Sequence, residues 1–415
     1  MGKTFVSLFS LLLATAIVLT GHGLQGTLIP IRGDIEAFSG TIIGLIGTAY
    51  YIGFILGCLH CPVIVQRSGH IRAFAAFASL ASVTPLIHAL IPSEIVWIFF
   101  RVVTGYCFCG LFMIIESWIN EEASSEMRGR VFSIYLAVNL ISITVGQLLI
   151  NLASPGSMIL FVLASILASF ALLPVALSNS SQPKPIQRVK LDLRRLWQTS
   201  SIGLVGCFVV GLTNGPFWTL APVFAREIGM DVRAISFFMT AAIFGGAVAQ
   251  WPIGRLSDVI DRRKVIIFVS LGAVIGEVWL VSVAEILSQT GLLLVTFCFG
   301  AFSLTLYPVC IAQANDHTKE GDFVSVSGGL LLSFSIGAII GPAIASIAMI
   351  SLGTGVIFIF SAAFHTIYAF YVLSQLTLHR MVPPEERSGF VVVPVSRIAP
   401  ETFELDPRAE IKKEP

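Results

Sequence analysis

Twelve apolar runs, each close to 20 residues or longer, follow one another along this chain of 415 residues. A run of about 20 apolar residues crosses a bilayer as an α-helix, because in lipid every backbone group must be satisfied within the segment. A charged content of only 12% and a mean hydropathy of +0.88 exclude a water-soluble globular enzyme, a disordered chain and a secreted disulfide scaffold. We therefore predict an all-α membrane protein. Its twelve predicted transmembrane helices are 5–31, 40–61, 71–91, 94–118, 131–152, 156–178, 200–225, 234–255, 264–286, 290–314, 323–350 and 352–378.

The basic residues are distributed unevenly over the segments between these spans. If both termini are cytoplasmic, the inside segments hold 15 Lys and Arg residues even without the C-terminal tail, against 3 outside: Arg32, Arg226 and Arg233. Such a bias sets orientation, so we predict a multi-pass protein with both termini in the cytoplasm. The first run continues to Pro30, which favours a retained helix over a cleaved signal peptide. The net charge of +1 provides no basic surface for nucleic acid.

A polar segment divides the chain into two halves. It carries Pro183 and Pro185 and then the apolar residues Leu193, Leu196 and Trp197, whose spacing suits a short helix at the membrane surface; a plain linker is the alternative. The charged, proline-bearing tail is predicted to be disordered. The predicted parts are a six-helix half at 1–178, a cytoplasmic linker at 179–199, a second six-helix half at 200–378 and a cytoplasmic tail at 379–415.

The two halves repeat each other weakly. A shift of 192 residues aligns Thr27-Leu28 with Thr219-Leu220, and it also aligns the loop 62–72 with the loop 254–264. A common offset at separate places indicates duplication of a six-helix unit. Duplicated helical halves are typical of transporters that bind their substrate between the halves and open alternately to each side.

Several motifs resemble those of a known family. The loop from Gly254 through Asp258 to Lys264 is similar to the signature loop of the major facilitator superfamily, and Arg101 followed by Gly105 and Gly110 resembles a second superfamily motif. The loop after span two is degenerate, with proline in place of the glycine and glutamine in place of the aspartate. Within the superfamily the chain resembles the bacterial YcaD-type branch, which implies a bacterial inner-membrane location. That second resemblance rests on Ile115-Glu116-Ser117, Arg128-Gly129-Arg130, Gly146-Gln147-Leu148-Leu149, Gln250-Trp251-Pro252-Ile253-Gly254-Arg255-Leu256 and Leu306-Tyr307-Pro308-Val309.

The resemblance implies a gate at the cytoplasmic end of span eight. Asp258 is expected to meet a helix N-terminus or an arginine, and Gly254 to admit a neighbouring helix. Because the first copy of the loop lacks the aspartate, we expect the second half to carry the lock. The alternative is that the cations only determine topology. The predicted gating residues are Gly254, Arg255, Asp258, Arg262, Arg263 and Lys264.

Arg101 is the basic residue that lies inside a span. A charge at membrane depth needs a partner or a water-filled cavity and marks a candidate functional site. His22 reaches a similar depth in span one, and helices one and four line the central cavity in the resembled superfamily, so the two residues are predicted to share a site. Bracing of helices by Arg101 is the alternative. Glu116 lies on nearly the same helical face as Arg101 and either takes up a proton or pairs with an arginine of the 128–130 segment.

Other polar residues are predicted to help orient a solute, although hydrogen bonding between helices is the alternative role for each. For Glu277 the resembled fold argues against a direct role, because it places the ninth helix at the periphery. The remaining candidates are Gln25, Asn139, Asn214, Trp218 and Tyr307.

These features predict a monomeric secondary active transporter of a small organic solute, acting by alternating access. No Walker-type phosphate loop is present, so we expect proton coupling rather than nucleotide hydrolysis, with no cofactor and no metal. An arginine in a site with few acids favours an anionic or zwitterionic solute. The alternatives are a facilitated-diffusion uniporter and a non-transporting membrane sensor or scaffold. An enzyme is not expected, because no nucleophile and base are paired at membrane depth. The sequence leaves import and export equally open.

Overall fold

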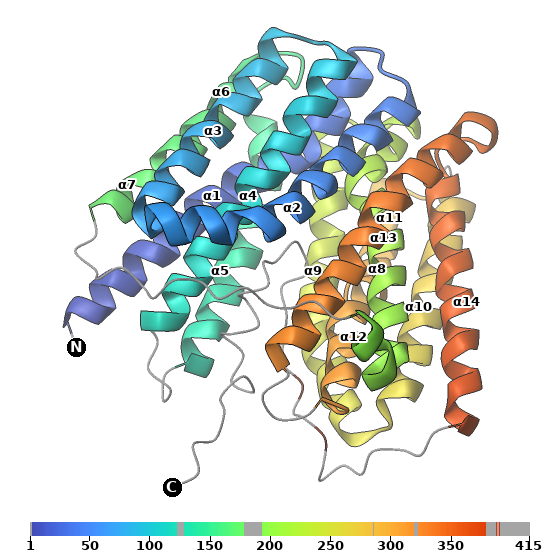
Figure 1. Ribbon diagram of the computed structural model, residues 1–415. Helices are drawn as coiled ribbons and strands as arrows, with labels where there is room; N and C mark the ends of the chain where they lie inside the picture. Colours follow the sequence, from blue (N-terminus) through green and yellow to red (C-terminus); the bar gives the residue numbers. More distant parts are fainter. Residues whose placement is uncertain are drawn as a thin grey trace, which may run out of the picture. The chain divides into compact units, whose positions relative to one another are not determined.

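The computed structural model describes residues 2–122, 128–177, 193–284, 286–318, 323–378, 387 and 390, and every regular element within them is a helix (Figure 1). The first half of the chain contains α1 (Gly2–Ile35), α2 (Gly40–Ser68), α3 (His70–Leu90), α4 (Glu94–Glu122), α5 (Arg128–Leu149), the short 3₁₀ helix η1 (Ile150–Leu152), α6 (Ile159–Phe170) and α7 (Leu172–Ala176). The second half contains α8 (Leu193–Glu227), α9 (Val232–Val259), α10 (Arg262–Val283), α11 (Gln289–Ser303), α12 (Leu306–Asn315), α13 (Phe323–Leu352) and α14 (Val356–Leu378).

Twelve helical stretches of the described residues are long and apolar enough to cross a membrane, which confirms the predicted all-α architecture. Two predicted spans consist of two helices each, α6 with α7 and α11 with α12. Each break lies four residues before a proline: α6 ends at Phe170 before Pro174, and Leu304 precedes Pro308. Proline lacks the N–H that would bond the carbonyl four residues earlier, and its ring collides with that carbonyl. The chain therefore bends at both places.

The helices pack into two compact units. One lies within residues 1–36 and 49–190, and the other within residues 37–48 and 191–395. In the first unit α1 packs on α5 and α6, while α3 packs on α4 and α6. In the second unit α8 packs on α13 and α12, α9 on α11, and α10 on α14. Figure 1 shows α8 and α13 running side by side through the second unit.

A pair of glycines repeats the same helix crossing in both units. Gly53 of α2 faces the backbone carbonyl of Val102 on α4, and Gly245 of α9 faces the carbonyl of Phe297 on α11. A Cβ at either glycine would overlap that carbonyl, so only glycine permits the approach. Gly53 and Gly245 are separated by 192 residues, the offset found in the sequence. The duplication is therefore visible in the helix packing as well as in the amino-acid sequence.

The start of α8 shows how the linker enters the second unit. The helix begins at Leu193 and is kinked at Ser200, where φ is −154° and ψ is 89°. Leu196 is buried and its side chain reaches Gly329 of α13, whereas Trp197 is exposed. Residues 193–199 are therefore helical, and an amphipathic helix lying on the membrane surface stays a prediction. Residues 178–192 and the tail, apart from Arg387 and Phe390, lie outside the described residues, and so does the disorder predicted for the tail.

Candidate functional site

Arg101 and His22 both lie next to one aromatic residue, Tyr50, in the first unit. The Arg101 guanidinium lies over the ring of Tyr50, with Cζ 4.9 Å from the ring centroid. The His22 ring centroid is 5.5 Å from that of Tyr50 and 4.5 Å from that of Phe108. Arg101, Tyr50 and His22 are all buried. We call these residues, together with Phe112, whose ring centroid is 6.0 Å from that of His22, the Arg101 cluster.

Gly105 explains why the Arg101 cluster forms where it does. It lies one turn after Arg101 on α4, against the backbone of Tyr50 on α2, and a Cβ there would overlap the Tyr50 carbonyl. The close approach of the two helices brings the ring of Tyr50 beneath the guanidinium. A cation over an aromatic face gains about 0.5–2 kcal/mol, with more in a desolvated setting. Both motif residues therefore contribute to one contact: Gly105 lets α2 approach α4, and Arg101, one turn earlier, lies over Tyr50 of α2.

Glu116 lies on the same helix as Arg101, about 22 Å further along it at 1.5 Å per residue. Its Oε1 accepts a hydrogen bond of 2.5 Å from the hydroxyl of Tyr135 on α5, and both side chains are buried. Asn139, one turn after Tyr135, donates from Nδ2 to the Tyr135 carbonyl at 2.9 Å. The side chain of Arg128, one of the two predicted partners of Glu116, lies outside the described residues, and Arg130 is exposed.

The other predicted solute-orienting residues are distributed over both units. Gln25 is buried on α1 of the first unit, and neither atom of its amide has a hydrogen-bond partner in the described part of the chain. In the second unit Asn214 of α8 accepts from Ser303 Oγ at 3.2 Å, and Trp218 of α8 is half-buried. The buried hydroxyl of Tyr307 on α12 also has no hydrogen-bond partner within the described ranges. Gln25 and Tyr307 thus offer buried polar groups to a ligand.

The loop 254–264 contains a buried ion pair that the sequence motif does not include. Arg262, the first residue of α10, donates from Nε to Asp316 Oδ2 at 2.8 Å, and the two side chains are only 1% and 2% exposed. Asp316 directly follows α12, so the pair joins the start of one helix to the end of another. The motif aspartate, Asp258, is 3.3 Å from Arg262 and is 41% exposed. The motif pair is therefore the weaker and more hydrated of the two.

A second carboxylate, Asp261, starts α10. It is the N-cap residue, accepts from the Arg263 backbone N–H at 3.0 Å and forms an ion pair of 2.7 Å with the Arg263 side chain. Burial raises the pKa of the Asp261 carboxyl, but the hydrogen bonds and charge of Arg263, together with the charge of Arg387, outweigh burial and hold the pKa below its usual value. Asp261 is therefore a fixed anion near neutral pH.

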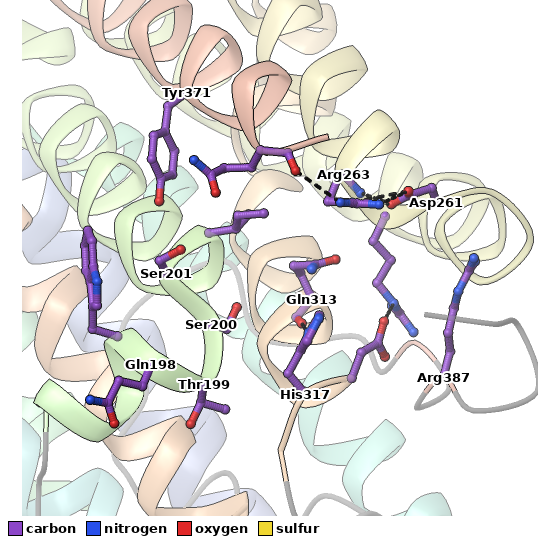
Figure 2. Close-up of a pocket in the computed structure, with 15 residues that line it drawn as sticks. Gln198, Thr199, Ser200, Ser201, Asp261, Arg263, Gln313, His317, Tyr371 and Arg387 are labelled. Atoms are coloured by element: carbon purple, nitrogen blue, oxygen red, sulfur yellow. Dashed lines mark hydrogen bonds and ion pairs between the residues drawn. The ribbon is translucent and has the colours of Figure 1, made fainter. Parts of the chain in front are cut away.

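A polar cavity of about 600 Å³ opens beside these ion pairs within the second unit. Figure 2 shows Arg263 turned toward Asp261, with Gln313 entering from α12, His317 from the turn that follows α12, and Tyr371 from α14. Its lining is rich in amides and hydroxyls, which are suited to holding water or a polar solute. The residues around it are Trp197, Gln198, Thr199, Ser200, Ser201, Ile202, Asp261, Arg262, Arg263, Gln313, Asp316, His317, Tyr371, Gln375 and Arg387.

The remaining motif residues depart from the expected roles. The atoms nearest to a Cβ built on Gly254 belong to the ring of Phe390 from the tail, whereas a neighbouring helix was expected there. Of its two predicted partners, a helix N-terminus or an arginine, Asp258 has the arginine, Arg262, and its Oδ1 also accepts from the Phe390 backbone N–H at 2.9 Å. Arg255 is exposed and lies over the ring of Trp251, with its Cζ 4.1 Å from the centroid, and Lys264 is also exposed. The buried partners in this region are therefore Arg262 and Arg263.

Sequence reasoning missed three partners, two of which lie on or directly after other helices and one of which is a near neighbour in the chain. Tyr135, Asp316 and Asp261 bind Glu116, Arg262 and Arg263, respectively. Asp261 carried a usable signal, since an aspartate directly before a helical run is a common N-cap. Glu277, expected at the periphery, is fully buried and faces His365 of α14. In the described residues no group of three or more His, Cys, Asp or Glu is placed to hold a metal ion.

The fold, with twelve membrane-crossing stretches and buried charged residues among the described residues, defines a multi-pass helical membrane protein. The sequence profile of the Major Facilitator Superfamily matches residues 11–203 and 203–408. This chain belongs to that superfamily, as its motifs suggested. The chain is 26% identical over 376 residues to a protein of Escherichia coli named "Uncharacterized MFS-type transporter YcaD", an alignment that covers 89% of this chain and 96% of that protein.

Solved structures of the same fold are more distant in sequence. The nucleoside transporter NupG is 11% identical, with a TM-score of 0.75 over 89% of this chain and 98% of its own. A bacterial homolog of the human lysosomal transporter Spinster, in an inward-facing and occupied conformation, is 14% identical, with a TM-score of 0.73 over 94% and 99%. At such identities the likeness defines the fold, and the resemblance to YcaD-type proteins is the informative one for this chain.

Proposed function

We propose that this protein is a secondary active transporter that moves a small organic anion or zwitterion across the bacterial inner membrane by alternating access, coupled to protons. Both termini are placed in the cytoplasm by the distribution of basic residues. The observation that carries the proposal is the Arg101 cluster, a buried guanidinium held over Tyr50 inside a membrane span. The family and the YcaD-type relatives support transport as the general activity.

The substrate class follows from the charge of Arg101. A guanidinium at membrane depth costs several kcal/mol unless an anion or a polar cavity compensates it. Its planar fork matches a carboxylate or phosphate in two parallel hydrogen bonds. Tyr50 and His22 supply aromatic surface beside it, and Gln25 of the same unit has a buried amide available for hydrogen bonding. A solute with one anionic group and an apolar or ring-shaped body fits this chemistry.

Proton coupling is assigned to titratable groups of the first unit. His22 adjoins Tyr50, so its protonation adds a positive charge close to Arg101 and changes the attraction for an anion. Glu116, held by Tyr135, is a second candidate on the same helix. The loop 254–264, with its pairs at Arg262 and Arg263, is proposed as the cytoplasmic gate, and it acts by fixing the ends of α10 and α12.

Uptake into proteoliposomes under an imposed pH gradient tests the proposal, with a panel of radiolabelled carboxylates, zwitterions and lipophilic cations. Arg101→Ala should reduce uptake of the responding anion at least tenfold, and Arg101→Lys should restore part of it, because lysine keeps the charge without the fork. Arg233→Ala is the matched control, since Arg233 is an exposed arginine that lies over Phe237.

Unchanged anion uptake in Arg101→Ala would refute the site. Flux that ignores the pH gradient would replace the coupled transporter with a uniporter. Absence of uptake for every class in the panel, with folded protein in the vesicles, would favour the non-transporting alternative.

A further inference from the structure

A second buried pair of titratable groups lies in the second unit. The Nδ1 atom of His365 on α14 is 3.0 Å and 3.1 Å from the two carboxylate oxygens of Glu277 on α10. Both side chains are fully buried. The other ring nitrogen, Nε2, lies 3.2 Å from the hydroxyl of Thr213 on α8. The three residues thus connect three helices of the unit in one hydrogen-bonded chain, inside membrane-crossing stretches.

We propose that Glu277 and His365 form a proton-binding site, with Thr213 as its third member. The proposal deepens the proposed function, on which it rests for its physiological role, because coupled transport requires a group that binds and releases the proton. Ionisable residues inside a membrane span are rare and costly and mark functional sites when they are paired. This pair was not anticipated from sequence, since His365 stands 88 residues from Glu277.

The hydrogen bonds define the proton content of the resting pair. The Thr213 hydroxyl donates to the Val209 carbonyl at 3.0 Å on its own helix, so it accepts from His365 Nε2–H. One further proton then lies between His365 Nδ1 and Glu277, on either the nitrogen or the oxygen. Both arrangements are neutral overall, which is the inexpensive condition for a buried pair.

Losing that proton forces a rearrangement of the site. An ionised Glu277 facing a bare Nδ1 lone pair would be repelled, so His365 must move its remaining proton to Nδ1. Its Nε2 then becomes an acceptor and requires a donor, which the Thr213 hydroxyl provides only by leaving the Val209 carbonyl. Release of a proton to water therefore changes a hydrogen bond on α8, two residues before the Gly215-Pro216 step of that helix.

Among the residues that the structure describes, no other fixed charge lies close to the Glu277–His365 pair. The helices packed around the pair carry charged side chains only near their ends, with Arg262, Arg263 and Lys264 at the start of α10 and Arg226 and Glu227 at the end of α8. Glu277 is about 20 Å from Arg263 along α10. The other titratable side chains on α8, α11, α12 and α14 are weak acids: Cys207, Cys298, Tyr307, Cys310, Tyr368 and Tyr371. In the described part of the chain, Glu277 and His365 therefore interact chiefly with each other and with Thr213.

Polar groups connect this region with the cavity at the end of the unit. Ser270 lies midway between Arg263 and Glu277, seven residues from each, and so on the same face of α10. Its buried hydroxyl has no hydrogen-bond partner in the described part of the chain. On α14, Tyr371 lines the cavity, and the buried Tyr368 hydroxyl donates to Ile202, another lining residue. Polar side chains that can relay protons therefore lie on α10 and α14, between the cavity and the Glu277–His365 pair.

Infrared difference spectroscopy of the reconstituted full-length protein between pH 5 and pH 9 tests the proposal without any substrate. A carboxyl that gains a proton in an apolar site produces a C=O stretching band well separated from that of carboxylate. The band should be present in the wild type and lost in Glu277→Gln, and it should persist in Glu227→Gln, which changes an exposed glutamate at the end of α8 in the same unit. A difference spectrum of Glu277→Gln that coincides with the wild-type spectrum would overturn the proposal.

A second variant, which keeps the Glu277 carboxyl, tests the proposal even if Glu277→Gln does not fold. Thr213→Val removes the hydroxyl that accepts from His365, so the pH midpoint of the band should move by on the order of one unit, the equivalent of one hydrogen bond. Thr296→Val is the control, because the buried Thr296 hydroxyl bonds only the Leu292 carbonyl of its own helix. An unmoved midpoint in Thr213→Val would also overturn the proposal.

The outcome is separable from that of the uptake assay. Loss of the band in Glu277→Gln together with pH-independent uptake in the wild type would preserve the proton site and remove the coupling. Persistence of the band in Glu277→Gln together with pH-driven uptake would remove this site and leave the coupling to His22 and Glu116.

Discussion

The two copies of the loop that precedes the third helix of each unit have the same position in the fold and different chemistry. In the first unit α3 begins at His70, whose Nε2 lies 3.1 Å from the Ser117 hydroxyl on α4. In the second unit α10 begins at Arg262, 192 residues later, which forms a buried ion pair with Asp316 after α12. Both side chains are buried and both connect the third helix of a unit to the fourth. Duplication kept the geometry, while the charge differs.

The residues just before these helices differ in the same way. The N-cap position of α3 is Gly69, with φ of 80° and no side-chain hydrogen bond, whereas α10 has Asp261, which accepts from the Arg263 backbone N–H. The left-handed φ explains the glycine, since a side chain is strained there. In the first copy Arg67 and Arg72 are exposed. In the second copy Arg262 and Arg263 are buried, and each is paired with a carboxylate. Of the two loops, the one in the second unit therefore makes the stronger electrostatic interactions.

The largest effect is expected from removing the cation of the second copy. Arg262→Ala leaves Asp316 buried without its guanidinium, which should destabilise the protein by about 3 kcal/mol. His70→Ala, the equivalent change in the first copy, removes only a neutral hydrogen bond and should cost about 1 kcal/mol. Thermal unfolding of the two variants in the same detergent measures the difference. Equal losses would show that the two loops are energetically equivalent in spite of their different chemistry.

A smaller and pH-dependent effect is expected at Asp261. Its lowered pKa means that its contribution to stability is present above the ordinary value near 3.8 and is lost as the pH falls through the lower folded value. Asp261→Asn should therefore lower the unfolding midpoint at pH 7, by about 1 kcal/mol in stability, and the gap to the wild type should narrow at an acidic pH below 3.8. A gap that is the same at both pH values would assign the loss to the cap and not to the ion pair.

The smallest effect is expected at the exposed cations that occupy equivalent positions in the two loops. Lys264→Ala and Arg72→Ala should each change stability by less than about 0.5 kcal/mol, because both side chains are in water. Unfolding curves that overlay the wild type would meet this expectation. A large loss in Lys264→Ala alone would extend the charged network of the second unit beyond the pairs described.

Much of the fold was predictable because it depends on local properties. Runs of apolar residues identify the twelve spans, and the spacing of Arg101 and Gly105 identified the helix on which the buried cation lies. That the second half carries the cytoplasmic lock stays a prediction; in its loop 254–264 the buried ion pair of Arg262 is with Asp316, and Asp258 is not the principal partner. For Glu277 the number of its helix argued against a direct role and did not determine its surroundings, which in the structure are buried and include His365.

The sequence by itself determined that the chain spans a membrane, which family it belongs to, and which few charged residues stand at membrane depth. These properties follow from composition and spacing within single helices, where the energy of transfer into lipid acts residue by residue. Only the tertiary structure decided the partners: Tyr50 for Arg101, Tyr135 for Glu116, Asp316 for Arg262 and His365 for Glu277. Each pair joins different helices, and such contacts depend on helix packing through close glycine crossings, which no local pattern specifies.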